Sequence, residues 1–152
     1  GELSDRAAEW IELKNVSGKT LNIQNCVVGD QGDSSSSLSD SEFFLEDGAF
    51  FLLARSNDTT VNGGLETDAT FRFSLNNGGD EIRLFCGDEL IDAVLYGTSG
   101  LSATGASLAR SGPVLNTENQ VGIDWCEGTN TYFDAPEHLG SPGTENPPCP
   151  RD

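Results

Sequence analysis

The sequence has 152 residues, enough for one domain with a buried core, and its 25 acidic residues against eight basic ones give a net charge of −17. Such a charge repels phosphate backbones and anionic membrane surfaces, which argues against nucleic acid and membrane partners. No apolar run approaches the length of a membrane span, and eighteen glycines and six prolines spread along the chain indicate many turns.

The first predicted strand covers residues 9–15, where apolar and polar residues alternate. Ile11 and Leu13 fall on one face, which we expect to be buried, and Glu12 falls on the other. Because odd and even positions of a strand face opposite sides, Glu9 and Glu12 cannot act on one substrate as a carboxylate pair.

A second strand is predicted over residues 20–28, with a polar interruption at Gln24 and Asn25. The apolar residues before the interruption have odd numbers and those after it have even numbers, so both sets face the core only if a bulge or kink lies between them. Residues 29–42 form a polar loop of mainly Gly, Asp and Ser, whose Asp spacing does not fit an EF-hand.

The middle of the chain holds the clearest strand signals. Residues 49–54 are a continuous apolar run, which is typical of a strand covered on both sides. A loop is predicted at 55–69, and apolar and polar residues alternate again at 70–75. Residues 79–97 then predict a hairpin, two strands joined by a tight turn at 86–89.

After this hairpin the signals weaken. Residues 97–106 are a loop of small residues, and 107–110 are a candidate short strand. Trp125 is one of the last aromatic anchors. Residues 140–143 close the predicted domain, and 147–152 form a tail.

The four cysteines, Cys26, Cys86, Cys126 and Cys149, are scattered along the chain without a CxxC pair. Four thiolates can make an all-cysteine zinc site, but structural zinc sites usually draw their ligands from closely spaced pairs. Two disulfides are therefore favoured, and they place the protein outside a reducing cytosol.

Taken in order, these segments resemble a lamin tail domain of the kind found in bacterial secreted proteins. The motifs that carry the resemblance are EWIELKN at 9–15, TLNIQNCVVGD at 20–30, GAFFLLA at 48–54, LNNGGDEIRL at 75–84, LIDAVLYG at 90–97, SLAR at 107–110, Trp125, and GSPGTEN at 140–146. The resemblance implies an all-β fold, an immunoglobulin-like β-sandwich of two antiparallel or mixed sheets. We expect a single domain over residues 1–152, with its core at about 9–146.

Two departures from the family pattern matter. The family usually has an additional strand before EWIEL, and here that strand is short or truncated. The family also usually has Trp where this chain has Cys26, so we expect a covalent bond to take over part of the packing. Cys86, on the buried face of its strand, is the natural partner. We predict disulfides Cys26–Cys86 and Cys126–Cys149, the second of which would pin the tail beside Trp125.

The resemblance implies a non-catalytic interaction or structural module of a larger extracellular, cell-surface or periplasmic protein, attached to other domains and able to bind a protein or polysaccharide. The chain lacks Met and a signal-peptide pattern, so we expect a mature form or an excised piece of a longer chain. There is no GxSxG, Walker A or HExxH motif. His138 with Asp134 and Ser141 can be drawn as a triad, but a lone His in a Gly- and Pro-rich tail is more often a surface residue, so we expect no enzyme.

Two alternatives stay open. One is a nucleic-acid- or chromatin-associated module, by analogy with nuclear lamins, and the other is a calcium-dependent adhesion module. If a calcium site forms, we expect it among Asp30, Asp33, Asp40 and Asp47, because hard oxygen ligands are concentrated there without a competing base. We expect no other metal or cofactor, and no membrane insertion.

Duplex DNA is expected not to bind measurably at physiological salt. Much of the acidic excess lies in segments 29–47 and 111–152, and the scattered arginines leave no basic stripe. A gel band shift with labelled duplex over a salt series tests this. Micromolar binding that weakens with added salt would contradict the prediction and favour the chromatin-associated alternative.

Overall fold

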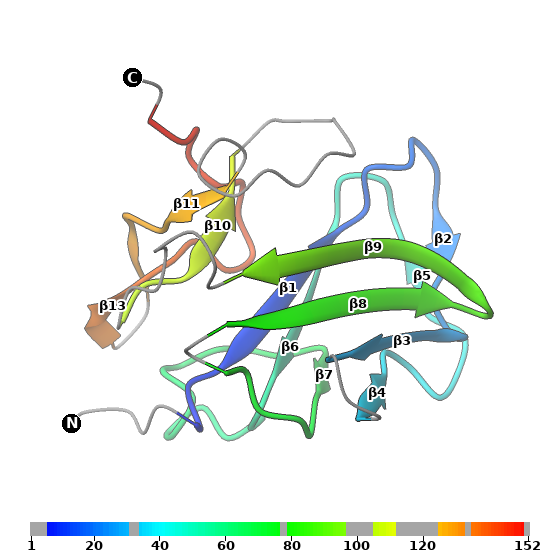
Figure 1. Cartoon of the computed structure of the whole chain (residues 1–152), viewed down its shortest axis with the longest axis horizontal. Helices are drawn as coiled ribbons and strands as arrows, with labels where there is room; N and C mark the ends of the chain where they lie inside the picture. The colour runs from blue at the N-terminus through cyan, green and yellow to red at the C-terminus, as the bar shows by residue number, and fades with distance from the viewer. Residues whose placement is uncertain are drawn as a thin grey trace.

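A computed structural model describes residues 6–30, 34–76, 79–96, 105–111, 125–132 and 135–150. In these residues the chain is all-β, with thirteen strands and no helix, as the sequence predicted (Figure 1). Most of the strands belong to two sheets that stack on one another, and three short pairs complete the structure.

The largest sheet has the strand order β4-β3-β8-β9 and is antiparallel throughout. Its strands are β3 (Cys26–Gly29), β4 (Ser35–Ser37), β8 (Asp80–Cys86) and β9 (Glu89–Tyr96). Strands β8 and β9 form the predicted hairpin, and Gly87 takes a φ of 62° in its turn, a conformation that glycine adopts without a steric penalty. A bulge interrupts the pairing between Leu84 and Phe85.

The second sheet has the order β1-β6-β7. Its strands are β1 (Trp10–Lys14), β6 (Phe50–Ala54) and β7 (Ala69–Thr70). Strand β6 pairs antiparallel with β1 and parallel with β7, so the sheet is mixed. Residues 51–54 of β6 are all buried, which confirms the prediction of a strand covered on both sides.

Three two-stranded antiparallel pairs lie outside these sheets. Their strands are β2 (Leu21–Asn22) with β5 (Phe44–Leu45), β10 (Leu108–Arg110) with β11 (Trp125–Glu127), and β12 (Thr131–Tyr132) with β13 (Ala135–Leu139). The candidate strand at 107–110 is therefore confirmed as β10. Strand β13 lies where the sequence showed no strand pattern.

Side chains from both large sheets form one core, as a β-sandwich requires. Figure 1 shows β8 and β9 crossing in front of β1 and β6. The buried members of the core are Ile11, Ile23, Cys26, Val28, Leu38, Leu45, Phe51, Leu53, Phe71 and Phe73. Leu13, Ile82 and Leu84 pack against it, so the predicted inward faces of β1 and β8 are confirmed.

The segment 20–28 is not one strand, and this prediction was wrong. The chain turns at Gln24 and Asn25, and β2 and β3 on either side of the turn pair with different strands. The Cys26 amide donates to the Ile23 carbonyl at 3.1 Å across this turn. The predicted kink is confirmed, and it lets Ile23 and Val28 both reach the core.

Two predicted loops are more ordered than their composition indicated. Within 29–42, residues 35–37 form β4 on the edge of β3. Within 55–69, Asn62 is completely buried, and its side chain donates to the carbonyls of Ser56 and Leu65 at 2.9 and 3.0 Å. Much of the third predicted loop, 97–106, lies outside the described residues.

Both predicted disulfides are present, and no cysteine is free, which excludes the all-cysteine zinc site. Cys26 and Cys86 are directly opposite one another in β3 and β8, with their Cα atoms 4.0 Å apart. Cys126 of β11 is joined to Cys149, with their Cα atoms 5.7 Å apart. Cys149 is buried, so the second bond holds the C-terminal segment against the strand that contains Trp125.

Replacing the cysteines pairwise by serine tests their contributions. The first disulfide closes 60 residues and the second 23, so Cys26→Ser/Cys86→Ser is expected to lower the free energy of unfolding by about 4 kcal/mol and Cys126→Ser/Cys149→Ser by about 3 kcal/mol. Urea unfolding followed by tryptophan fluorescence measures both losses. A larger loss from the second pair would contradict this order.

Candidate functional site

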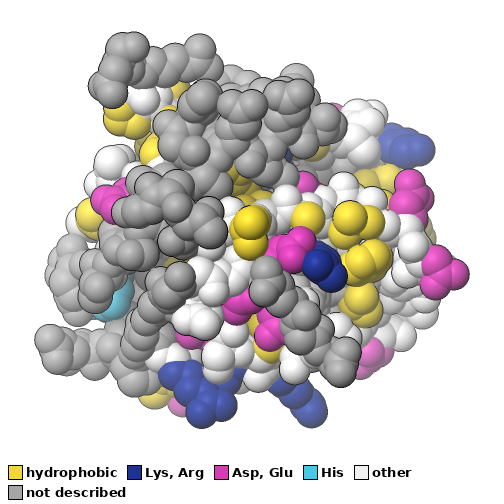
Figure 2. Space-filling view, in the orientation of Figure 1, with side chains coloured by type: hydrophobic (Ala, Val, Ile, Leu, Met, Phe, Trp, Pro, Cys, Tyr) yellow, Lys and Arg dark blue, Asp and Glu magenta, His cyan; other side chains and the backbone are white. Residues whose placement is uncertain are grey.

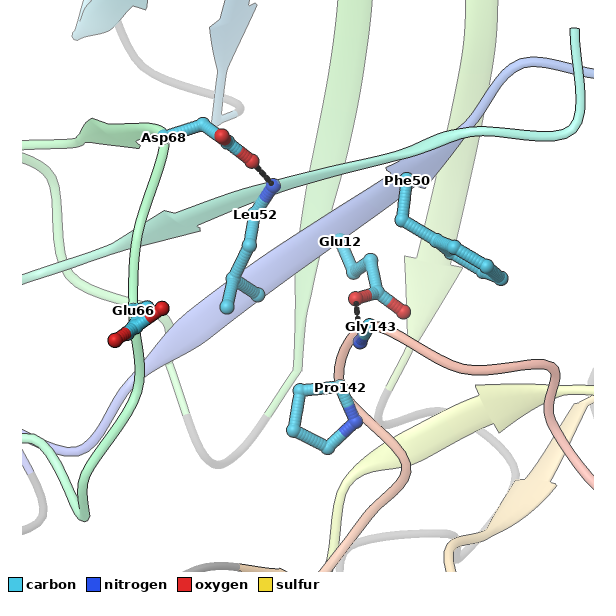
Figure 3. Close-up of a pocket in the computed structure, with 7 residues that line it drawn as sticks. All are labelled: Glu12, Phe50, Leu52, Glu66, Asp68, Pro142 and Gly143. Carbon is cyan, nitrogen blue, oxygen red and sulfur yellow. Dashed lines mark hydrogen bonds between the residues drawn. The ribbon is translucent and has the colours of Figure 1, made fainter.

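A hollow of about 160 Å³ lies between the β1-β6-β7 sheet and residues 142–143 near the C-terminus (Figure 3). Glu12 of β1 and Phe50 and Leu52 of β6 contribute side chains from the sheet. These even-numbered positions point away from the core, because Ile11, Phe51 and Leu53 point into it. The hollow therefore lies on the outer face of this sheet. Its other lining residues are Glu66, Asp68, Pro142 and Gly143.

Glu12 is the central polar group of the hollow. Its Oε2 accepts a hydrogen bond from the Gly143 amide at 2.5 Å, and Figure 3 shows the carboxylate pointing at that amide. Burial raises the pKa of Glu12 from 4.5 to about 7. This pKa is the net result of burial, of the Gly143 hydrogen bond, which lowers it, and of the negative charge of Asp68, which raises it.

Lys14 makes a second link between β1 and the same C-terminal segment. Its Nζ lies 2.9 Å from Oε1 of Glu145 and 5.4 Å from the centre of the Phe50 ring. Both side chains of the ion pair are substantially exposed, so the pair alone contributes little to stability. With the Glu12–Gly143 hydrogen bond, it places residues 143–145 beside β1.

Asp68 forms two hydrogen bonds with the backbone of β6. Its Oδ2 accepts from the Leu52 amide at 2.9 Å, and its own amide donates to the Leu52 carbonyl at 2.8 Å. The lining of the hollow thus offers carboxylates and apolar surface, and no Ser, Thr, Cys, Lys or His is among its residues. The contacts that Glu12 and Lys14 make attach the C-terminal segment to the sheet.

The described residues that were considered for catalysis make contacts with other parts of the chain. The Glu9 carboxylate accepts from the Leu75 amide at 3.2 Å and lies 3.8 Å from Nε of Arg55, away from the Glu12–Gly143 contact. His138 is part of β13, and the Ser141 hydroxyl donates to Oδ1 of Asn146 at 2.6 Å. Asp134 lies outside the described residues.

Three of the four calcium candidates are described, and they make local contacts of different kinds. The Asp47 carboxylate accepts from the Gly18 amide at 3.0 Å. The Asp40 carbonyl accepts from the Gln24 side chain at 3.3 Å, and the Asp30 amide donates to the Ser34 carbonyl at 3.4 Å. Within the part of the chain that the structure describes, no three His, Cys, Asp or Glu residues are grouped to hold a metal ion. Asp33 is not described, and the calcium site stays a prediction.

Sequence reasoning missed the hollow around Glu12. It placed Glu12 correctly on the outward face of its strand, but nothing local indicated burial. The burial comes from Pro142 and Gly143, 130 and 131 positions along the chain. The motif GSPGTEN at 140–146 indicates the end of the domain, but no pattern in the sequence shows which strand it contacts.

The two stacked sheets and the core that they share define an immunoglobulin-like β-sandwich. The family model of the Lamin Tail Domain matches residues 1–98, well over half of the chain, and the chain therefore belongs to this family of non-catalytic modules. The match spans β1 to β9. Neither curated proteins nor solved structures gave a match. Among the described residues there is no helix of the length and apolarity that a membrane span needs.

Glu12 is expected to make stability depend on pH. The folded state retains the proton to about pH 7 and the unfolded chain only to about pH 4.5, so the free energy of unfolding falls as the pH rises through this window. Glu12→Gln removes the titration and keeps an acceptor for Gly143. The variant is expected to be more stable than the parent at pH 8, on the order of 1 kcal/mol after allowing for solvent screening of a partly exposed group.

Urea unfolding at pH 5, 6, 7 and 8 measures this difference. Glu66→Gln removes a carboxylate from the same hollow and is the matched control, which is expected to keep the pH dependence of the parent. A Glu12→Gln variant with an unchanged slope between pH 5 and 7 would contradict the assignment.

Proposed function

We propose that this chain is a non-catalytic binding or architectural module of a larger extracellular or cell-surface protein. The observation that carries the proposal is the pair of disulfides in a lamin tail domain. Such bonds persist in oxidising compartments and are rare in the cytosol. A non-catalytic family supports a role in binding or in holding neighbouring domains rather than in turnover.

The charge of the chain supports a protein or polysaccharide partner. With 25 acidic and eight basic residues, the surface disfavours the phosphate contacts that supply most of the affinity for nucleic acids. This difference in charge argues against the chromatin-associated role. A bacterial origin of the secreted type, suggested by the order of the motifs, is part of the proposal.

Two parts of the fold bear on where a partner could contact this module, namely the loop at 55–69 and the strand β1. The conformation of the loop at 55–69 is stabilised by the hydrogen bonds of buried Asn62. Only the exposed residues of this loop are therefore available to contact a partner. Strand β1 lies at one edge of the β1-β6-β7 sheet in the described part of the chain. An edge position is a second way to contact a partner, by strand pairing.

The purified chain is expected to show no turnover above the buffer rate with ester, phosphate, peptide or glycoside substrates, because its family is non-catalytic and no Ser, Thr, Cys, Lys or His lines the described hollow. Chromogenic substrates of the four classes, assayed across pH 5 to 8, provide the measurement. Activity that persists through purification and disappears in Glu12→Gln or His138→Ala would overturn the non-catalytic assignment.

A further inference from the structure

Exposed apolar side chains gather on the face of the β4-β3-β8-β9 sheet that points away from the core. The described residues include six large hydrophobic side chains that are well exposed, and three of these belong to β9. They are Leu90, Ile91 and Leu95, which are 52%, 50% and 50% exposed. The pairing of Leu90 with Phe85 and of Leu95 with Glu81 places these two leucines on the face that points away from the core. Figure 2 shows hydrophobic side chains gathered over β8 and β9. Concentrated apolar exposure of this kind marks interaction sites more often than scattered single residues do.

Strand register aligns these side chains into rows across the sheet. Phe85 of β8 lies opposite Val27 of β3 on one side and opposite Leu90 of β9 on the other. Leu95 lies opposite Glu81 at the far end of β8. Because directly opposed residues share a face, these residues form one surface, which we call the outer face.

A hollow of about 130 Å³ opens on the outer face next to the apolar row. Val27, Phe85 and Arg83 line it together with Gly29 and Asp30. A Cβ added to Gly29 would approach the Ser34 carbonyl oxygen to 2.9 Å, so the close approach of the two backbones requires glycine there. The outer face therefore offers an apolar surface with a recess large enough for part of one side chain.

The charges on this sheet are almost all negative. Arg83 is its one base in the described segments 26–30, 35–37 and 80–96, and the guanidinium is balanced by Glu81, with Nη2 2.8 Å from Oε2. The acidic residues in the same segments are Asp30, Asp80, Glu81, Asp88, Glu89 and Asp92. The register places Asp80, Glu89 and Asp92 on the opposite face, with core-facing Ile82, Leu84 and Cys86. On the outer face the charge of Glu81 is balanced by Arg83, and Asp30 adds an uncompensated negative charge beside the hollow. Together with the net charge of −17, this favours a cationic partner. A second copy of the chain, also at −17, would be repelled.

We propose that the outer face docks an extended, cationic segment of a partner protein. Large apolar side chains of that segment pack on Phe85, Leu90 and Leu95, and its lysines or arginines meet the surrounding carboxylates. The inference rests on the proposed binding role and names its surface and the class of its partner. The turnover assay tests the non-catalytic assignment, and the peptide-binding assay tests the docking surface. Either proposal can therefore fail without the other.

A fluorescein-labelled ten-residue peptide of alternating leucine and lysine is the probe, measured by fluorescence anisotropy at physiological salt. The parent chain is expected to bind it at micromolar concentration. Leu90→Gln/Leu95→Gln leaves the charge unchanged and removes exposed apolar surface, so it is expected to weaken binding about tenfold or more. Val16→Gln/Val61→Gln removes exposed apolar side chains elsewhere and is expected to bind as the parent does.

Charge is tested with a second matched pair. Asp30→Asn removes the carboxylate that lines the hollow on the outer face and is expected to weaken binding, whereas Glu127→Gln, which removes an exposed acid in β11, is expected to leave binding unchanged. An alternating serine–lysine peptide should bind at least about tenfold more weakly, because it lacks apolar side chains.

Equal binding by the parent and Leu90→Gln/Leu95→Gln, or no binding of the leucine–lysine peptide, would overturn the proposal. A dimer that this double variant dissolves would also overturn it, since the occupant would then be a second copy.

Discussion

The disulfide between Cys26 and Cys86 fixes the point at which the chain changes sheets. Cys26 directly follows the turn at Gln24 and Asn25, and Cys86 directly precedes the turn of the β8-β9 hairpin. A hydrogen bond of 3.0 Å from the Gly87 amide to the Asn25 carbonyl continues the pairing beyond the covalent bond. The register of β3 on β8 is thereby set. A slip of one residue would turn Val28 out of the core and exchange the inner and outer faces of the sheet.

The outer faces of the two large sheets differ in what lies against them. On the β1-β6-β7 sheet, Trp10 packs with Leu52 and Leu65, and the segment around Gly143 is attached through Glu12. That segment lies beyond residues 1–98, the part of the chain that the family model matches. On the four-stranded sheet, Leu90 and Leu95 of β9 are each about half exposed to solvent. One outer face is thus joined to the C-terminal segment, and the other presents exposed apolar side chains.

Sequence reasoning succeeded where a local pattern determines burial. Alternation identified the inward positions of β1 and β8, and the continuous apolar run at 49–54 identified the central strand β6 (Phe50–Ala54). It failed where pairing with a distant partner creates the element. Residues 35–37 are three serines without an apolar pattern, and they form a strand because the edge of β3 is available to them. The environment of Glu12 likewise depends on Gly143, a contact that no local rule in a single sequence indicates.

The two covalent loops also determine how the domain responds when its ends are pulled apart. Residues between Cys26 and Cys86, and those between Cys126 and Cys149, cannot lengthen under tension while the bonds are intact. A fully extended chain of 152 residues would reach about 530 Å, and the two loops withhold about 290 Å of that length. A force that unravels every strand would therefore extend the domain to less than half of its contour length. Reduction of both disulfides would more than double the length to which the unfolded domain can extend.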